Sequence, residues 1–176
     1  MNERFDRLVM PHLDAAYNLA RWITRNDHDA EDVVQESFVR AMRYFDRFRG
    51  DAAKPWLLAI VRNTSYTWLQ KNRPSEMVAM DEPALEAQYE AQGLSSGEGN
   101  PEVVLLQGAN RKLVNQALEE LPVPFREIVV MREIEDLSYK EIAEIAGIPA
   151  GTVMSRLTRG RELLKHALEK RMRRAS

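Results

Sequence analysis

The apolar residues among the first 72 positions recur every three or four residues in three blocks, which predicts three amphipathic helices. The first block runs from Phe5 to Ile23, and the second begins after Asn26-Asp27 and ends near Phe45. The third opens at Lys54-Pro55, where proline suits a first helical turn. Its inner side carries Leu57, Ile60, Val61, Thr64 and Trp68. No stretch alternates in steps of two, so we expect three helices around one core.

The pattern is lost after this region and then returns. Residues 74–101 contain proline, glycine and serine together with acidic residues and no basic residue, a composition typical of a solvated linker, with room for a local helix at 84–91. Periodicity resumes at Val104, stops at Pro122 and Pro124, and starts again at Phe125. The sequence therefore predicts an all-α chain with a helical domain at 1–73, an acidic flexible linker at 74–101 and a second helical domain at 102–176.

Residues 137–157, LSYKEIAEIAGIPAGTVMSRL, have the order of a helix-turn-helix. Ser138 and Glu141 form a capping-box pattern that starts one helix, and Gly147 supplies the left-handed conformation that ends it. Thr152 or Gly151 is expected to cap the second helix, with Val153 and Leu157 facing the core. The second helix then presents an outer face that suits a DNA major groove, and the alternative is a helical corner that packs on protein. The residues of that outer face are Met154, Ser155, Arg156, Thr158 and Arg159.

The distribution of charge supports DNA binding although the formal net charge is −2. Residues 75–108 hold seven acidic and no basic side chains, and residues 150–176 hold eight basic against two acidic ones. The acidity is therefore concentrated in the linker, and the end of the second domain is cationic.

Several classes of function are disfavoured by the composition. The chain has no cysteine, which removes disulfides and thiolate sites and fits a cytoplasmic location. No signal-peptide pattern opens the chain, and the longest strongly apolar run, WLLAIV, is too short for a membrane span, so no membrane insertion is expected. The three histidines lie in different elements and no glycine-rich phosphate loop is present. We therefore expect no enzymatic activity, no catalytic residue, no metal site and no cofactor.

Three stretches, taken in order, resemble the extracytoplasmic-function (ECF) sigma factors of bacterial RNA polymerase, in the sigma-70 family. They are DAEDVVQESFVRAM, FRGDAAKPWLLAIVRNT and LPVPFREIVVMREIEDLSYKEIAEIAGIPAGTVMSRLTRGRELL. The resemblance covers both predicted domains, about four-fifths of the chain. It implies a promoter-specificity subunit that binds core RNA polymerase, through the beta-prime clamp helices and the beta subunit, and promoter DNA. It also implies an anti-sigma factor as an inhibitory partner.

The resemblance assigns roles to individual residues. The face that binds the beta-prime clamp helices corresponds to Asp32, Gln35 and Glu36. The surface that reads the minus-ten element corresponds to Asp51, Lys54, Arg62, Asn63 and Tyr66, where the Asn63 amide suits an unpaired base edge. The helix that reads the minus-thirty-five element corresponds to Thr152, Ser155, Arg156, Thr158 and Arg159. Met154 departs from the family, since many relatives carry arginine there.

Two other functions remain open at the level of the sequence. One is a sigma mimic that sequesters an anti-sigma factor without binding DNA, against which the presence of Asn63, Arg156 and Arg159 argues. The other is a free-standing helix-turn-helix regulator, which the DVVQESF and WLLAIVRNT stretches disfavour.

Overall fold

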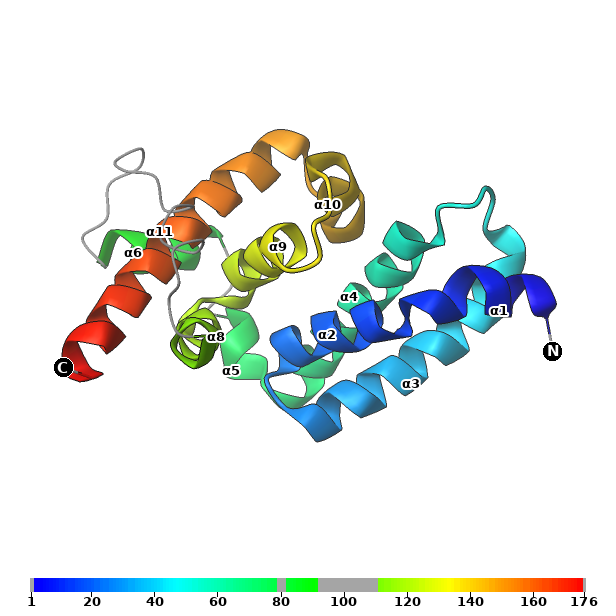
Figure 1. Ribbon diagram of the computed structural model, residues 1–176, viewed down its shortest axis with the longest axis horizontal. Coiled ribbons are helices and arrows are strands. Elements are labelled where there is room, and N and C mark those ends of the chain that lie inside the picture. The colour runs from blue at the N-terminus through cyan, green and yellow to red at the C-terminus, as the bar shows by residue number, and fades with distance from the viewer. Residues whose placement is uncertain (1, 79–81, 92–110, 176) are drawn as a thin grey trace.

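The computed structural model describes residues 2–78, 82–91 and 111–175, and every regular element in these ranges is a helix (Figure 1). Two groups of helices are present, one from each predicted domain. Figure 1 shows the N-terminal group, α1 to α4, at one end of the molecule and the C-terminal group, α8 to α11, at the other. The all-α architecture expected from the periodicity is confirmed.

The first predicted helix is divided by Pro11. Helix α1 (Glu3–Val9) is followed by a 3-10 turn, η1 (Met10–His12), and then by α2 (Leu13–Thr24). Proline lacks an N–H group and its ring clashes with the preceding helical turn, so a helix that reaches it is interrupted. Leu13 and Ala16 keep three- and four-residue steps after Val9, which is why periodicity alone joined the two helices, although Leu13 is 40% exposed.

The other two helices of the first domain begin and end close to where the sequence places them. Helix α3 (Asp27–Tyr44) starts at Asn26, whose side chain accepts a hydrogen bond from the Asp29 amide at 3.0 Å. A 3-10 turn, η2 (Phe45–Arg47), leads towards α4 (Ala53–Asn72). Helices α2, α3 and α4 share one core, whose larger members are Leu19, Ile23, Val33, Leu57, Leu58, Val61 and Leu69.

Two helices lie in the segment predicted to be a flexible linker. Helix α5 (Pro74–Val78) follows α4 directly, and α6 (Glu82–Ala91) lies beside α11 (Figure 1). Leu85 and Tyr89 are four residues apart, so they share one face of α6, and both are buried, at 2% and 3% exposure. The structure therefore differs from the expected flexible linker at 74–78, and the local helix for which 84–91 left room is present as α6, packed on α11 rather than solvated. Residues 79–81 and 92–101 of the predicted linker lie outside the described residues.

The second domain consists of α8 (Arg111–Glu120), α9 (Val123–Glu133), α10 (Tyr139–Ala146) and α11 (Ala150–Ala175). Its core includes Leu118, Phe125, Ile128, Met131, Ile142, Ile145, Val153, Leu157, Leu164 and Leu168. Helix α11 crosses α9 closely at Gly160, where an added Cβ would lie 2.7 Å from Cγ2 of Val129. Val104 and Leu105, which opened the predicted second domain, lie outside the described residues.

The two domains contact each other through α2 and α9 and through α4 and α10. Arg126 of α9 is 2% exposed, and its guanidinium donates across the interface to the Trp22 and Ile23 carbonyl oxygens at 2.7 and 3.3 Å. It also donates to the Leu121 carbonyl at 2.7 Å. Burial and the neighbouring charge of Arg25 lower the pKa of Arg126 to about 10, which still leaves it charged at neutral pH. This arginine therefore joins the domains by satisfying carbonyl groups of both.

Candidate nucleic-acid and polymerase interfaces

Helices α10 and α11 form the helix-turn-helix predicted from the sequence. The Ser138 hydroxyl accepts a hydrogen bond from the Glu141 amide at 3.1 Å, and the Glu141 carboxylate accepts one from the Ser138 amide at 3.0 Å. The helix ends at Gly147, whose φ of 67° lies in the left-handed region that glycine adopts without strain. The expected capping box and glycine stop are both confirmed.

The start of α11 differs from the expectation. The helix begins at Ala150, directly after Pro149, and the Thr152 and Val153 amides donate to the Pro149 carbonyl at 3.0 and 3.1 Å. Thr152 and Gly151 therefore lie inside the first turn, and neither caps the helix as predicted. The Pro149 carbonyl already accepts the first amides of the helix, so Pro149 itself occupies the position before it.

The outer face of α11 carries the side chains predicted to read the minus-thirty-five element. Val153 and Leu157 are buried, whereas Ser155 and Thr158 are exposed and Met154 is 54% exposed. The Ser155 and Thr158 hydroxyls donate to carbonyls of their own helix, at 3.1 and 3.0 Å, and retain lone pairs for another donor. Thr152 and Arg156 are half-buried at the edge of this face.

Arg159 belongs to the same face but is covered by α6. Its guanidinium forms an ion pair with the Glu86 carboxylate and lies 5.1 Å from the centre of the Tyr89 ring. The Tyr89 hydroxyl donates to the Glu162 carboxylate, and burial with this contact raises the pKa of Tyr89 to about 12. The phenol therefore remains a donor at neutral pH. Glu86 and Tyr89 were not anticipated from the sequence, because they lie in the segment that composition assigned to solvent.

The residues predicted to read the minus-ten element fall into two groups on α4 and the loop before it. Asp51 and Asn63 are exposed. Lys54, Arg62 and Tyr66 lie against the second domain, where Lys54 Nζ is 3.7 Å from Glu135 Oε2. The structure therefore places Tyr66 in an interface with the second domain, whereas Asn63 lies on an exposed face of α4.

Arg62 makes the most extensive polar contact of this group. Its Nε and Nη2 atoms donate to the two Glu127 carboxylate oxygens at 3.0 Å each, and the Glu127 side chain is fully buried. The guanidinium also lies 4.1 Å from the centre of the Tyr66 ring. Burial by itself would lower the pKa of Arg62, but the charge and hydrogen bonds of Glu127, with Tyr66, reverse the sign and raise it. The Arg62 guanidinium is therefore charged at neutral pH.

The Tyr66 hydroxyl is buried without a hydrogen-bond partner among the described residues. Burial, and next the nearby Glu127 charge, raise the pKa of this phenol well above its ordinary value. A buried donor without a partner costs about 1–3 kcal/mol. Nothing in the periodicity of α4 could have indicated this, since the burial comes from the second domain.

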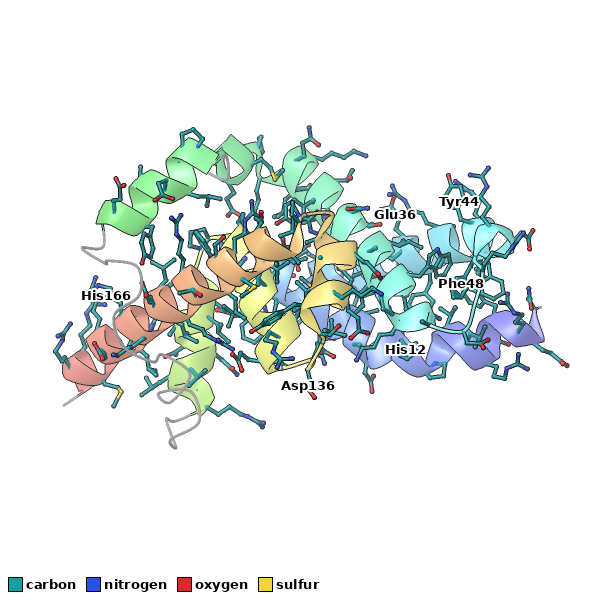
Figure 2. All side chains as sticks on the ribbon, turned by 90° about the horizontal axis from the view of Figure 1, so that it is seen from above. His12, Glu36, Tyr44, Phe48, Asp136 and His166 are labelled. Carbon is teal, nitrogen blue, oxygen red and sulfur yellow. The ribbon has the colours of Figure 1, made fainter. Side chains whose placement is uncertain are left out.

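The predicted polymerase-binding residues lie together on the outer face of α3. Asp32, Gln35 and Glu36 are exposed, and Glu36 accepts a hydrogen bond from Arg40 at 2.8 Å. Figure 2 shows Glu36 and Tyr44 on one edge of the first domain and His12 on the other. Val39 and Met42 continue this face and are 50% and 56% exposed. Met42 belongs to the apolar pattern of the helix, so its exposure marks an apolar surface that the pattern did not predict.

The described residues contain no cluster of three histidine or acidic side chains that could hold a metal ion. His12 and His166 lie in different domains (Figure 2). In the same part of the chain, no helix is both long enough and apolar enough to span a bilayer.

Comparison with known proteins agrees with this geometry. Residues 8–74 match the model of Sigma-70 region 2, and residues 111–164 match that of Sigma-70, region 4. The ECF RNA polymerase sigma-E factor of Salmonella typhimurium is 41% identical over 150 residues, which are 83% of this chain and 77% of that protein. The ECF RNA polymerase sigma factor SigE of Mycolicibacterium smegmatis is 34% identical over 94% of this chain and 62% of its own length.

A solved structure has the same fold. The sigma factor RpoE of Bartonella quintana, crystallised in complex with the anti-sigma factor NepR, superposes with a TM-score of 0.70 at 24% identity, over 96% of this chain and 98% of that one. A free-standing helix-turn-helix regulator is excluded, because both domains match sigma factor models and a sigma factor is 41% identical over 83% of the chain. The chain belongs to the ECF sigma factors, which are promoter-specificity subunits of bacterial RNA polymerase in the sigma-70 family.

Proposed function

We propose that this sigma factor binds core RNA polymerase through the outer face of α3. Asp32, Gln35 and Glu36 supply charge and hydrogen-bonding groups on that face, and Val39 and Met42 supply apolar area beside them. Apolar side chains surrounded by polar ones are typical of protein-binding surfaces. The beta-prime clamp helices are the partner that the family resemblance assigns to the first three residues. The beta subunit is the further contact expected of the family.

The same proposal gives the two domains separate places on the promoter. Asp51, Lys54, Arg62, Asn63 and Tyr66 read the minus-ten element after the strands separate, and Thr152, Ser155, Arg156, Thr158 and Arg159 read the minus-thirty-five element in the major groove. Met154 takes the place of a polar contact found in many relatives. An exposed methionine can contact a thymine methyl group but cannot donate to guanine.

The observation that carries the proposal is the outer face of α11. Ser155 and Thr158 are exposed and Arg156 lies half-buried at the edge of this face, while Val153 and Leu157 anchor the helix in the core. A second helix of this kind, in a helix-turn-helix with a basic end, suits a major groove. Control by an anti-sigma factor is the remaining part of the proposal. It is supported by the family and by the fold shared with a sigma factor crystallised with such a partner.

In-vitro transcription with core polymerase over a promoter library tests the proposal. We expect new start sites that share two spaced elements when the chain is added. Asn63→Ala should reduce strand opening, and Arg159→Ala should reduce dependence on the upstream element. Arg7→Ala removes an exposed arginine of α1 and is a matched control. It should change neither strand opening nor dependence on the upstream element.

A binding measurement isolates the polymerase face. Gln35→Ala combined with Val39→Glu should weaken association of the chain with core polymerase by about tenfold or more, since one charge is placed in an apolar contact. A chain that captures an anti-sigma factor yet yields no start site with any competent core enzyme would be a mimic, and the proposal would then be wrong.

A further inference from the structure

The loop that carries Asp51 contacts a residue from the start of the chain. This loop, residues 48–52, lies between η2 and α4, and Figure 1 shows it at the same end of the first domain as α1. The Arg4 side chain of α1 donates from Nη2 to the Gly50 carbonyl at 3.1 Å. The two residues are 46 positions apart in the sequence, so the contact comes from the tertiary fold and not from a local turn.

Aromatic rings hold the Arg4 guanidinium beside the loop. Phe48, the first loop residue, stacks on Trp56 of α4 with ring centres 4.9 Å apart, and Phe45 packs edge-to-face on Phe5 of α1 at 5.2 Å. The guanidinium of Arg4 lies 4.9 Å from the centre of the Phe45 ring and 5.7 Å from that of Phe48. A cation over an aromatic face is attracted to it. The rings that fix the root of the loop therefore also fix the donor that reaches its tip.

Backbone geometry alone does not fix the tip of the loop. Residues 49–52 are exposed, and Gly50 has a φ of 92°, a conformation that glycine exchanges readily for negative φ. Among the described residues, no atom beyond its chain neighbours lies within 4 Å of a Cβ added at Gly50, so packing does not select this conformation. Because the peptide unit is planar, a hydrogen bond to the Gly50 carbonyl orients the plane that leads to Asp51.

We propose that Arg4 is a positioning residue for base recognition: it holds the Gly50 carbonyl and thereby presents Asp51 to the minus-ten element. This inference rests on the proposed function of the loop and of α4. The role predicts a change in base preference. A residue that contacts phosphate weakens binding about equally for all sequences when it is removed, whereas loss of a base-reading geometry relaxes the preference at the position that is read.

In-vitro transcription with core polymerase tests the inference, on active promoters from the library whose minus-ten element is randomised. Barcoded templates let the transcripts report the base preference at each position. Arg4→Ala should reduce the preference about three- to tenfold at one or two adjacent positions, with dependence on the upstream element unchanged. Arg4→Lys keeps a charged donor and should recover most of the preference. Arg7→Ala removes an exposed arginine from the same helix and should leave every position unchanged.

Gly50→Ala tests whether Arg4 acts through the loop. Alanine is strained at a φ of 92°, and its Cβ meets no neighbour, so the substitution alters the loop conformation without a clash. If Arg4 acts through Gly50, the double variant should lose no more base preference than the more affected single variant. Losses that multiply in the double variant would show that the two residues act independently, and the inference would be wrong.

Hydrogen exchange on the full chain, without polymerase or DNA, measures the contact itself. The peptide that covers residues 48–56 should exchange faster in Arg4→Ala than in the native chain or in Arg7→Ala, because the loop tip has lost its donor. Peptides from α2 and α9 should exchange at the native rate, which shows that the helices remain folded. Native exchange in the loop of Arg4→Ala would contradict the positioning role.

The outcomes separate this inference from the proposed function. If the native chain has a clear minus-ten preference and Arg4→Ala shares it fully, the positioning role is wrong and the sigma activity stands. A loss of equal size on all sequences rejects the role in the same way, since it indicates a phosphate contact. If the native chain has no minus-ten preference although Arg4→Ala speeds exchange in the loop, the proposed assignment of the DNA surfaces fails instead.

Discussion

At the scale of residues, the buried serine and threonine hydroxyls of this protein donate to backbone carbonyls. The hydroxyls of Thr24, Ser37 and Ser65 donate to carbonyls four residues earlier, at 2.9, 2.7 and 2.8 Å. Each of these hydrogen bonds lies within one helix, so the hydroxyl needs no partner from a neighbouring helix. Arg126 is different, because its donors satisfy carbonyls of α2 as well as those beside α9. Arg126 therefore joins the two domains through backbone carbonyls, whereas Arg62 joins them through the Glu127 carboxylate.

Arg126→Ala should lower the free energy of unfolding by about 2–4 kcal/mol, because it leaves buried carbonyls of Trp22, Ile23 and Leu121 without their donor and creates a cavity. Urea unfolding followed by circular dichroism measures this. Arg7→Ala, which removes an exposed arginine, should change the same quantity by less than about 0.5 kcal/mol. If the two substitutions lowered the free energy of unfolding equally, Arg126 would not be a residue that holds the domains together.

At the scale of elements, local signals account for most helix boundaries. Asn26, the Ser138 capping box and Gly147 all lie where their chemistry predicts, since each acts on backbone groups within a few residues. The exposure of Met42 and the burial of Glu127 and of the Tyr66 hydroxyl could not be predicted in this way. The apolar period specifies which side of a helix is apolar. It does not specify where neighbouring elements end, nor which polar side the other domain covers.

Ser138→Ala tests the start of α10. The substitution removes the acceptor of the Glu141 amide, and loss of an N-cap of this kind costs about 1 kcal/mol. Thermal unfolding should show a lower midpoint, and Ser138→Asp, which restores an acceptor, should recover most of it. A midpoint that Ser138→Ala does not change would mean that the capping box contributes no stability.

Gly160→Ala tests the crossing of α9 and α11. The added methyl group would lie 2.7 Å from Cγ2 of Val129, and overpacking of this kind costs about 1–3 kcal/mol, offset by about 1 kcal/mol of helix propensity. Gly151→Ala provides the contrast, because no atom lies within 4 Å of the added group. Urea unfolding should show Gly160→Ala to be less stable than Gly151→Ala. The opposite order would contradict the close approach.

At the scale of the whole molecule, the two domains contact each other through two residues that the family resemblance assigns to DNA, Arg62 with Glu127 and Lys54 with Glu135. Arg62 and Arg159 form ion pairs with Glu127 and Glu86, which reduces the cationic character of α4 and α11. Part of this reduction comes from the segment that composition predicted to be an acidic linker, since that segment supplies Glu86. A formal net charge of −2 is therefore compatible with the two DNA-reading surfaces that we propose.

Site-specific cross-linking to promoter DNA tests the central claim most directly. A photo-crosslinking amino acid is placed at Ala52, in the loop before α4, or at Met154, on the exposed face of α11. With core polymerase present, we expect the two probes to cross-link two segments roughly 25 base pairs apart on one promoter, about 85 Å at 3.4 Å per base pair. Without core polymerase, we expect neither segment to be labelled. Cross-links from both probes within one turn of the helix, or the same pattern with and without polymerase, would contradict the account.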